Sequence, residues 1–330
     1  MLSVPFQRSS PDSVLFATYN LLNLFAGDSP GDREHYELAA TSIRSLGADV
    51  LAVQEIRAPG AETGSRRLRR LADDVGLECL VPPESGIGAP RAALAAGPRG
   101  YHVGLMWRSG IEPLPGSLRR YGARDFWHSL VALILDVGGA RVQHASHHAT
   151  PFGRILRADQ NERVVAMLAR PSRATPTAVG ADWNTEPADR VQDPGTGEWT
   201  LYEPGDPYEG AEWFSDMVHQ CEWDYDAQGR RRHWADRRPG DVLWAGGLHD
   251  AAAVLRAPWQ ATAGHHPADP FGVRGIRRRI DGVRVNEPML GALRAHHVAD
   301  TELTRSASDH LPVIVEYLPS GIGAGGGGGR

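Results

Sequence analysis

Apolar runs and amphipathic stripes alternate along the N-terminal part of the chain. Residues 14–19 form an apolar run of strand length, 33–46 carry apolar residues at helical spacing, and 49–53 form a second strand-like run. Gly47 directly follows the helical stripe, where a glycine cap commonly ends a helix. A strand, a helix and a strand in this order make up the repeating unit of α/β layer proteins. The pattern therefore predicts the α/β class.

The same alternation continues towards the C-terminus. Further helices are predicted at 66–76 and 157–170, and further strands at 79–81, 101–107, 130–137, 141–148, 178–182, 277–285 and 313–317. Between 190 and about 240 the pattern loosens into a stretch rich in Pro, Gly, Asp, Trp and Arg. Its tryptophans (Trp199, Trp213, Trp223, Trp234) are expected to form a small core of their own, although a stacking surface for bases or sugars is an alternative. We interpret 190–240 as a long insertion rather than a separate domain.

A carboxylate and an amide follow the apolar run that ends at Asp182. In an extended backbone, side chains two residues apart share a face, so Asp182 and Asn184 are expected to point into the same space, away from Trp183. Strand ends are where α/β sheets place their chemistry. A simple Asp/Asn turn explains the pair equally well. This stretch alone leaves a turn and a functional site both open.

Other predicted strand ends carry similar groups. They are Asn20, Glu55, His148, Asp281, and Asp309 with His310. Each alone has an ordinary explanation as a turn or surface residue, but so many at the ends of different strands favour one shared site. Carboxylate and amide oxygens suit Mg²⁺ or Mn²⁺. Histidine beside carboxylates can be held protonated, and an imidazolium can stabilise a developing oxyanion.

The histidines allow a second interpretation, a zinc site. Period-two alternation places His144, Ser146 and His148 on one strand face and His147 on the other. A zinc hydrolase built on these histidines together with His265 and His266 is disfavoured, because no HExxH spacing occurs. The chain's 2 cysteines are far apart and lack metal-ligand spacing.

Composition narrows the protein class further. With 41% hydrophobic and 23% charged residues, the chain has the composition of a soluble globular protein. A net charge of -5 gives no reason to expect general affinity for nucleic acid. The first 13 residues lack a signal-peptide pattern, and no apolar run reaches membrane-spanning length. We expect a cytoplasmic monomer without a membrane span.

Taken together, the motifs resemble the endonuclease/exonuclease/phosphatase superfamily of Mg-dependent phosphoesterases. The resemblance extends from Thr18 to Tyr317 and is most specific in its last motif. In chain order the motifs are Thr18-Tyr19-Asn20, Val53-Gln54-Glu55, Ser146-His147-His148 with Arg157 following, Gly180-Ala181-Asp182-Trp183-Asn184, Arg279-Ile280-Asp281 and Ser308-Asp309-His310-Leu311-Pro312. It implies a DNase I-like fold, a four-layer α/β protein with a two-sheet sandwich flanked by helices.

The resemblance also implies a metal and a water site. Glu55 would be a direct ligand of Mg²⁺ or Mn²⁺, and Asn20 and Asp309 would help to shape the metal site. Asp182 would orient or deprotonate the attacking water. Asn184 would hold the substrate phosphate or the carboxylate of Asp182.

Two imidazoles would then act on the phosphate. His310 would contact the scissile phosphate, and Asp281 would pair with His310 and favour its charged form. His148 would donate to a phosphate oxygen from the opposite side. His147 is the alternative for this last role, because the two histidines are adjacent in the motif.

The function implied is divalent-metal-dependent hydrolysis of a phosphoester, with a phosphodiester as the expected substrate, by in-line attack of water. The substrate partner would be nucleic acid, a nucleotide or a small phosphoester, and the acidic net charge favours a small one. The alternative is a non-catalytic binding or scaffold protein that keeps the fold. We predict a polar leader at 1–13, a single catalytic domain at 14–319 with the 190–240 insertion on its active face, and a disordered glycine-rich tail at 320–330.

Overall fold

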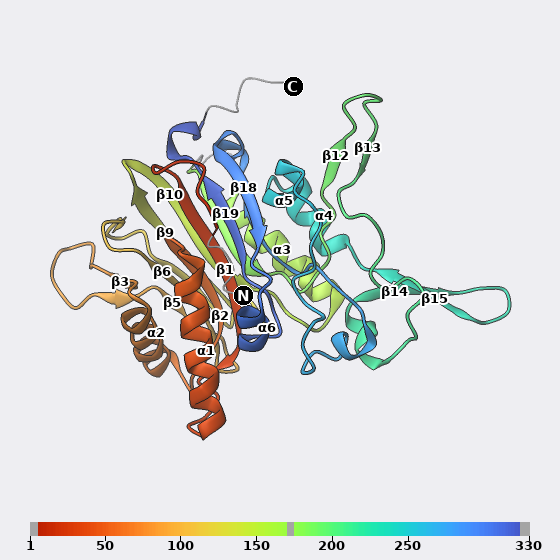
Figure 1. The fold of residues 1–330 in the computed structure, drawn as a ribbon, viewed down its shortest axis with the longest axis horizontal. Coiled ribbons are helices and arrows are strands. Elements are labelled where there is room, and N and C mark those ends of the chain that lie inside the picture. The colour runs from red at the N-terminus through yellow and green to blue at the C-terminus, as the bar shows by residue number, and fades with distance from the viewer. Residues whose placement is uncertain (1–5, 170–174, 324–330) are drawn as a thin grey trace.

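Two β-sheets pack face to face at the centre of the computed structural model, which describes residues 6–169 and 175–323 (Figure 1). The first sheet has the order β18 (Leu293–Val298), β19 (Val313–Tyr317), β1 (Val14–Leu24), β2 (Val50–Arg57), β6 (Tyr101–Trp107) and β5 (Leu94–Ala95). The second has the order β16 (His249–Asp250), β17 (Asp281–Val285), β11 (Thr177–Asp182), β10 (Ala140–His148), β9 (Ser129–Val137) and β7 (Glu112–Pro113), and β8 (Arg119–Tyr121) also pairs with β9. Two pairs of strands, β1 with β2 and β10 with β11, are parallel.

Helices cover the outer faces of the sandwich. Helix α1 (Pro30–Leu46) connects β1 to β2 and packs with α2 (Ala61–Val75) on the first sheet, while α3 (Arg154–Leu168) connects β10 to β11 and packs with α4 (Arg238–Ala245) on the second. The remaining helical elements are α5 (Ala251–Leu255), α6 (Glu302–Ala307), and the 3₁₀ turns η1 (Ser215–His219), η2 (Gly272–Arg274), η3 (Glu287–Ala292) and η4 (Pro319–Gly321). The predicted two-sheet α/β sandwich flanked by helices is confirmed.

Strand β1 shows why its sequence reads as an unbroken apolar run. Val14 and Phe16 lie in the buried cluster between the two sheets, and Leu15, Ala17 and Tyr19 lie in the cluster beneath α1 and α2. A strand covered on both faces needs apolar residues at every position rather than at alternate ones. Burial on both sides fixes the two parallel strands that lead into the candidate site.

The two sheets approach one another closely at Gly180 on β11. A Cβ atom there would lie 2.8 Å from Cβ of Thr18 and 2.9 Å from Cβ of Ala52. Any side chain would therefore push the second sheet away from β1 and β2. The glycine keeps the strand end at Asp182 close to the facing strand ends.

The 190–240 region folds into two hairpins and a short 3₁₀ turn. The hairpins are β12–β13 (Arg190–Gln192 and Trp199–Leu201) and β14–β15 (Cys221–Tyr225 and Arg231–Ala235), and a third small pair, β3–β4 (Leu80–Val81 and Arg91–Ala92), lies elsewhere in the chain. Trp213 packs against a small buried cluster that contains Tyr208 and Met217, whereas the Trp199 side chain is 57% exposed. The expectation of a separate small core therefore fits Trp213 and does not fit Trp199.

The ends of the described chain are tied to the sandwich. Arg8 donates to the Asp49 carboxylate at 2.6 Å, and the Ser9 backbone N–H donates to Glu316. Of the predicted disordered tail, residues 320 and 321 lie within η4, and Ile322 packs against the core between the sheets. The remainder of the predicted tail, 324–330, lies outside the described residues.

Two strands are longer than predicted. β1 and β2 continue past Asn20 and Glu55, so these residues lie within strands and not at strand ends. In both strands the pairing register shifts beside them. By contrast, residues 277–280, predicted as strand, lie outside β17, which begins at Asp281. No helix in 6–169 or 175–323 is both long enough and apolar enough to cross a membrane.

Candidate active site

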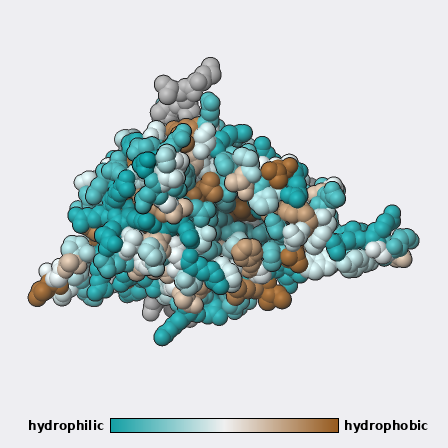
Figure 2. Space-filling view, turned by 90° about the horizontal axis from the view of Figure 1, so that it is seen from below, coloured by the Kyte–Doolittle hydropathy of each residue, from teal (hydrophilic) through white to brown (hydrophobic). Residues whose placement is uncertain are grey.

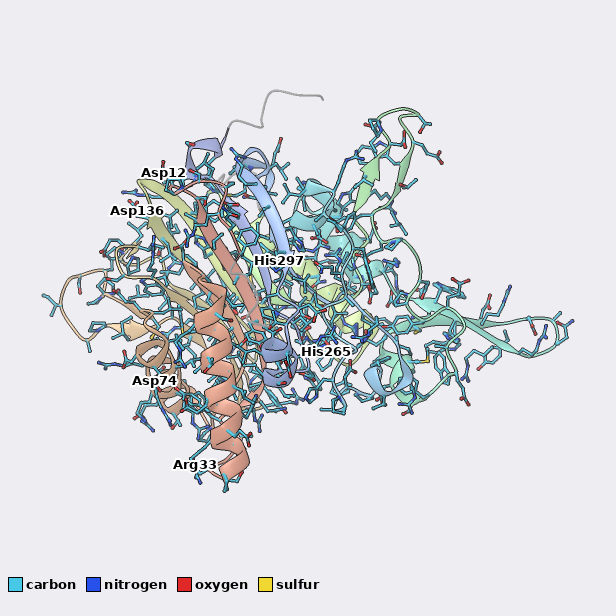
Figure 3. All side chains as sticks on the ribbon, in the orientation of Figure 1. Asp12, Arg33, Asp74, Asp136, His265 and His297 are labelled. Carbon is cyan, nitrogen blue, oxygen red and sulfur yellow. The ribbon has the colours of Figure 1, made fainter. Side chains whose placement is uncertain are left out.

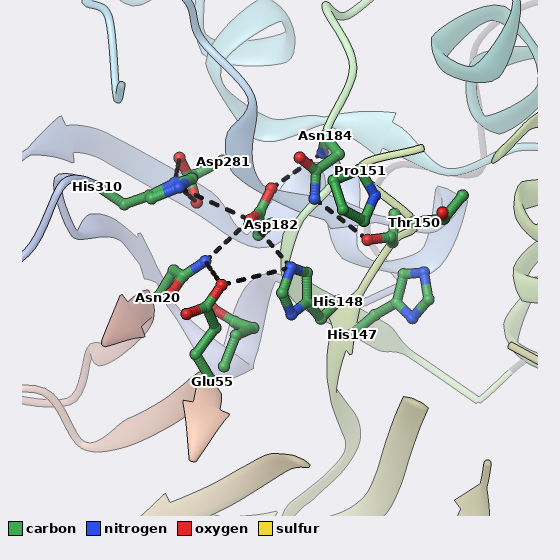
Figure 4. A network of polar contacts seen from close by, with 12 residues as sticks. Asn20, Glu55, His147, His148, Thr150, Pro151, Asp182, Asn184, Asp281 and His310 are labelled. Atoms are coloured by element: carbon green, nitrogen blue, oxygen red, sulfur yellow. Dashed lines mark hydrogen bonds and ion pairs between the residues drawn. The ribbon is translucent and has the colours of Figure 1, made fainter. Parts of the chain in front are cut away.

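The polar residues of the six motifs converge at one end of the sandwich. Asp182, at the end of β11, is buried and central: its Oδ2 accepts a hydrogen bond from Nδ2 of Asn20 at 2.9 Å and lies 3.3 Å from Nε2 of His148 (Figure 4). Its Oδ1 accepts from the backbone N–H of Asn184 at 3.0 Å. The Asn184 amide donates to the Ala149 carbonyl at 3.1 Å. Three strands and the loop after β11 thus fix one carboxylate.

The surroundings of Asp182 keep it ionised. Burial alone would raise its pKa, but His310, His148 and the Asn20 amide outweigh burial and lower the pKa of this carboxyl well below its ordinary value. A carboxylate of such low basicity suits orienting a water molecule better than retaining that water's proton.

His310 and Asp281 form a buried acid–imidazole pair. Nδ1 of His310 faces the Asp281 carboxylate at 2.8 and 3.0 Å, and the Asp281 backbone N–H donates to Oγ1 of Thr262 at 3.0 Å. Burial alone would lower the pKa of His310, but Asp281, Asp182 and Asp309 raise it well above its ordinary value. The proton of the pair therefore resides on His310. Its Nε2, 3.9 Å from Oδ2 of Asp182, remains available as a donor in the site.

The two adjacent histidines of β10 face opposite ways. His148 faces Asp182 and lines the cleft, and its pKa is raised because Asp182 and Glu55 outweigh the effect of burial. His147 points to the outer side, where its Nδ1 lies 3.0 Å from the Ser129 carbonyl and its ring packs against Phe126. The geometry matches the choice of His148 over His147, as period-two alternation predicts.

Backbone strain is concentrated around the site. Of the six non-glycine residues with positive φ in the described chain, Leu22, Asn23, Phe25, Glu55 and Asn184 lie in or beside it. Such conformations cost about 1–3 kcal/mol each and persist only where the surroundings enforce them. For Glu55, with φ of 63°, the surroundings include the Asn23 backbone N–H, which donates to Oε2 at 2.8 Å.

Glu55 and Asp309 are the carboxylates best suited to hold a metal ion. Oε1 of Glu55 accepts a hydrogen bond from Nδ2 of Asn20 at 3.3 Å, and both acids line the cleft. Neither is paired with an arginine anywhere in 6–169 or 175–323. Two carboxylates with free oxygen lone pairs match the ligand preference of Mg²⁺ or Mn²⁺. A divalent cation would also offset the excess of negative charge that Asp182 and Asp281 add.

A second grouping of potential ligands exists close by. One ligand atom from each of Asp182, Asp281 and His310 lies within 4.8 Å of the others. Because both Asp281 oxygens face the protonated Nδ1 of His310, we interpret this group as an acid–imidazole pair next to a carboxylate. Glu55 and Asp309, which line the cleft without a hydrogen-bonded imidazole among the described residues, offer carboxylate oxygens that suit a hard cation.

The histidines of the zinc interpretation do not gather. His144 lies in the core with its Nε2 3.0 Å from the Tyr317 hydroxyl, and Nε2 of His265 lies 3.0 Å from the Ser308 carbonyl, next to α6 (Figure 3). Within the described ranges, the one group of three or more potential ligands contains a single histidine, His310. The structure offers no histidine-rich ligand set of the kind that a zinc hydrolase needs.

The site opens into a cleft of about 650 Å³, on the face that Figure 2 shows hollowed near its middle. The 190–240 region contributes Asp216, His219 and Gln220 to its lining. Arg157 is buried behind the cleft and ties three loops together: its Nε donates to the Thr150 carbonyl at 3.0 Å, and its two terminal nitrogens donate to the Asn184 and His219 carbonyls. The insertion is thereby fastened to the strand ends.

Sequence reasoning missed His128. Its ring stacks on His148 with centroids 4.0 Å apart and planes 12° from parallel. Burial lowers the pKa of His128 well below its ordinary value, and the neighbouring His148 adds to this effect, whereas the pKa of His148 itself is raised. The only signal would have been the register of β9, where Ser129 pairs opposite His148. Register between strands is not visible in one sequence.

The two-sheet fold is that of the DNase I-like class. The chain matches the model of the endonuclease/exonuclease/phosphatase family over residues 17–310, and it belongs to that family. A comparison with curated proteins gave no match.

Solved structures of this class share the fold at low sequence identity. An AP endonuclease from Archaeoglobus fulgidus (14% identity, TM-score 0.54) aligns over 92% of this chain and 99% of its own. The human Nocturnin catalytic domain (14%, 0.55) aligns over 93% and 94%, and a mannosyl-6-phosphatase from Bacteroides thetaiotaomicron (14%, 0.53) over 92% and 98%. Because an AP endonuclease and a phosphatase resemble the chain about equally well, the fold alone does not select a substrate.

Proposed function

We propose that the protein hydrolyses a phosphodiester with the help of a bound divalent metal ion, Mg²⁺ or Mn²⁺. The observation that carries the proposal is the meeting of Asp182 and His310 at 3.9 Å in the cleft, one held ionised and the other held protonated. In-line attack at phosphorus requires an oriented water and donors for the charge that develops on the phosphoryl oxygens. Asp182 would orient the water, and His310 would supply a hydrogen-bond donor for the phosphoryl oxygens.

Each remaining residue supports one of these two groups. Asn20 and the Asn184 backbone hold the Asp182 carboxylate, which accepts a hydrogen bond from the attacking water. Asp281 fixes the tautomer of His310, whose Nε2–H donates to a phosphoryl oxygen. His148 donates to another phosphoryl oxygen, and Asn184 offers the second N–H of its amide to the substrate.

The metal ion would be held by Glu55 and Asp309, with Asn20 fixing the Glu55 carboxylate. When bound, it would withdraw charge from the phosphoryl group. The lack of arginine partners for both acids supports this assignment, since an occupied salt bridge would compete with the ion.

The proposal is tested with bis-p-nitrophenyl phosphate in Mg²⁺ or Mn²⁺. Asp182→Ala and His310→Ala should each lower kcat by a factor of about 10² to 10⁴ while leaving the circular dichroism spectrum unchanged. His297→Ala and Asp136→Ala, which lie away from the cleft, are the matched controls (Figure 3). Wild-type-like turnover in either site variant would overturn the role assignment.

Removing the metal ion and adding it back distinguishes Mg²⁺- or Mn²⁺-dependent hydrolysis from a zinc hydrolase and from a protein that binds without catalysis. EDTA should abolish turnover, and Mg²⁺ or Mn²⁺ should restore it better than Zn²⁺ does. A panel of abasic DNA, single-stranded DNA, phospholipid, inositol phosphates, sugar phosphates and nucleotides then distinguishes diesters from monoesters. If no member is hydrolysed, the chain is a binding or scaffold protein that keeps the fold.

A further inference from the structure

Three aromatic rings contribute to the lining of the cleft. Trp127, Phe152 and His219, here called the aromatic wall, stand edge to face, with centroids 6.1 Å apart for Trp127 and Phe152 and 5.0 Å apart for Phe152 and His219. All three line the cleft, and the Phe152 side chain is 49% exposed. An aromatic ring that is exposed in a cleft contributes little to the hydrophobic core. It offers an apolar surface on which a ligand can pack.

The aromatic wall is attached to the catalytic elements and not to a free loop. Phe152 follows His148 by four residues, and its backbone N–H donates to Oγ1 of Thr150 at 3.2 Å. Trp127 directly precedes His128, whose ring stacks on His148. His219 is held through its carbonyl by Arg157 at 2.6 Å. The wall therefore stands beside the His148 side of the scissile position.

A cation lies flat on the end of this wall. The Arg99 guanidinium is 3.4 Å from the centroid of the Trp127 ring and forms no ion pair within the described ranges. Stacking on the indole keeps the guanidinium in place and leaves its N–H groups free for an anion. Arg99 can contact a second phosphate that flanks the ring-binding surface.

We propose that the aromatic wall receives a nucleobase adjacent to the scissile phosphate, so that the substrate is a nucleotidyl phosphodiester. This inference rests on the phosphodiesterase function proposed above. A base can lay its face on Phe152 and present its polar edge to Asp216 and His219, which line the same part of the cleft. An acyl chain would leave those two polar groups without partners, and a sugar alone would not cover the rings.

The charges along the cleft indicate a short substrate. Asp216 and Asp269 line the cleft together with Arg99 and Arg278, and Arg278 is already paired with Asp269 at 2.7 Å. A long duplex needs a continuous basic surface, which a net charge of -5 does not favour. A dinucleotide or the end of a single strand fits these charges.

The test compares two matched tetramers, oligothymidylate and the same phosphodiester chain with tetrahydrofuran in place of each nucleoside. Because one base stacks on the aromatic wall, the wild type should cleave the base-bearing chain with a KM lower by a factor of about five or more. Phe152→Leu should reduce this ratio to within about twofold of one. Trp199→Leu, which removes an exposed tryptophan on β13 outside the cleft lining, should keep the wild-type ratio.

Equilibrium binding keeps the inference testable without turnover. In EDTA, the anisotropy of fluorescein-labelled tetramers should show binding of the base-bearing chain to the wild type that is tighter by a factor of about five or more, and loss of this preference in Phe152→Leu. Equal binding of both chains, or faster hydrolysis of phosphatidyl vesicles than of either tetramer, would overturn the inference. A base preference in binding without hydrolysis of any diester would instead refute the proposed function and leave the aromatic wall as a base-binding site.

Discussion

The loop that carries Asp182 and Asn184 also contains a buried carboxyl group with an unusual environment. Glu186 is only 3% exposed, and its Oε1 has no hydrogen-bond partner within the described ranges. Burial raises the pKa of Glu186 from its ordinary 4.5 to about 7, and the nearby Glu203 adds to this effect while Arg237 opposes it. The replacement Glu186→Gln keeps the shape of the neutral acid and removes the titration.

The direction of the pH effect follows from proton binding. Between about pH 4.5 and 7 the folded protein holds a proton on Glu186 that the unfolded chain has released, so stability falls as pH rises through this window. Below about pH 4.5, Glu186 is protonated in both the folded and the unfolded protein and has no effect on the pH dependence of stability. Above about pH 7, the folded protein carries the full free-energy cost of the buried Glu186 carboxylate. The gap between 4.5 and about 7 corresponds to a cost on the order of 3 kcal/mol.

Urea denaturation of the wild type and of Glu186→Gln at several pH values between 4 and 8 measures this cost. The variant should match the wild type near pH 4, gain stability progressively from about pH 4.5, and exceed it by about 3 kcal/mol at pH 8. Glu212→Gln, at an exposed position, controls for the loss of one negative charge. A difference that is constant across the pH range, or a variant less stable than the wild type at pH 8, would refute the reasoning.

Three further predictions concern the site and its support. His128→Ala should lower kcat for the phosphodiester roughly tenfold by freeing the His148 ring, and His128→Phe should restore most of the loss by keeping a flat ring there, as steady-state kinetics can show. Mg²⁺ at 100 times its Kd should stabilise the wild type by about 2.7 kcal/mol in thermal melts, and Glu55→Gln should lose most of this gain. Gly180→Val should cost at least about 1–3 kcal/mol in urea denaturation, because its side chain would meet Thr18 and Ala52 across the sandwich.

The parts of the fold that could be predicted are those that depend on local pattern. Helix α1 was predicted from its apolar stripe and Gly47, and the structure adds the Ser29–Asp32 capping box that begins the helix. The apolar runs likewise located β11 and β19. Strand ends beyond such runs indicated the neighbourhood of Asp182 and His310, although the roles of both residues remain predictions until activity is measured.

The features that escaped prediction depend on contacts between segments far apart in the chain. The hydrophobic pattern ended the first two strands before Asn20 and Glu55, because neither residue favours a strand. In the structure both strands continue, and the left-handed backbone at Glu55 is compensated by the Asn23 N–H and the Asn20 amide, which bind its two carboxylate oxygens. The aromatic wall depends in the same way on the pairing of β9 with β10, which brings Trp127 and Phe152 together from separate motifs. These pairings depend on the whole sandwich and cannot be read from short stretches of one sequence. Short motifs can therefore locate the candidate catalytic residues, whereas they cannot locate the surface that would select the substrate.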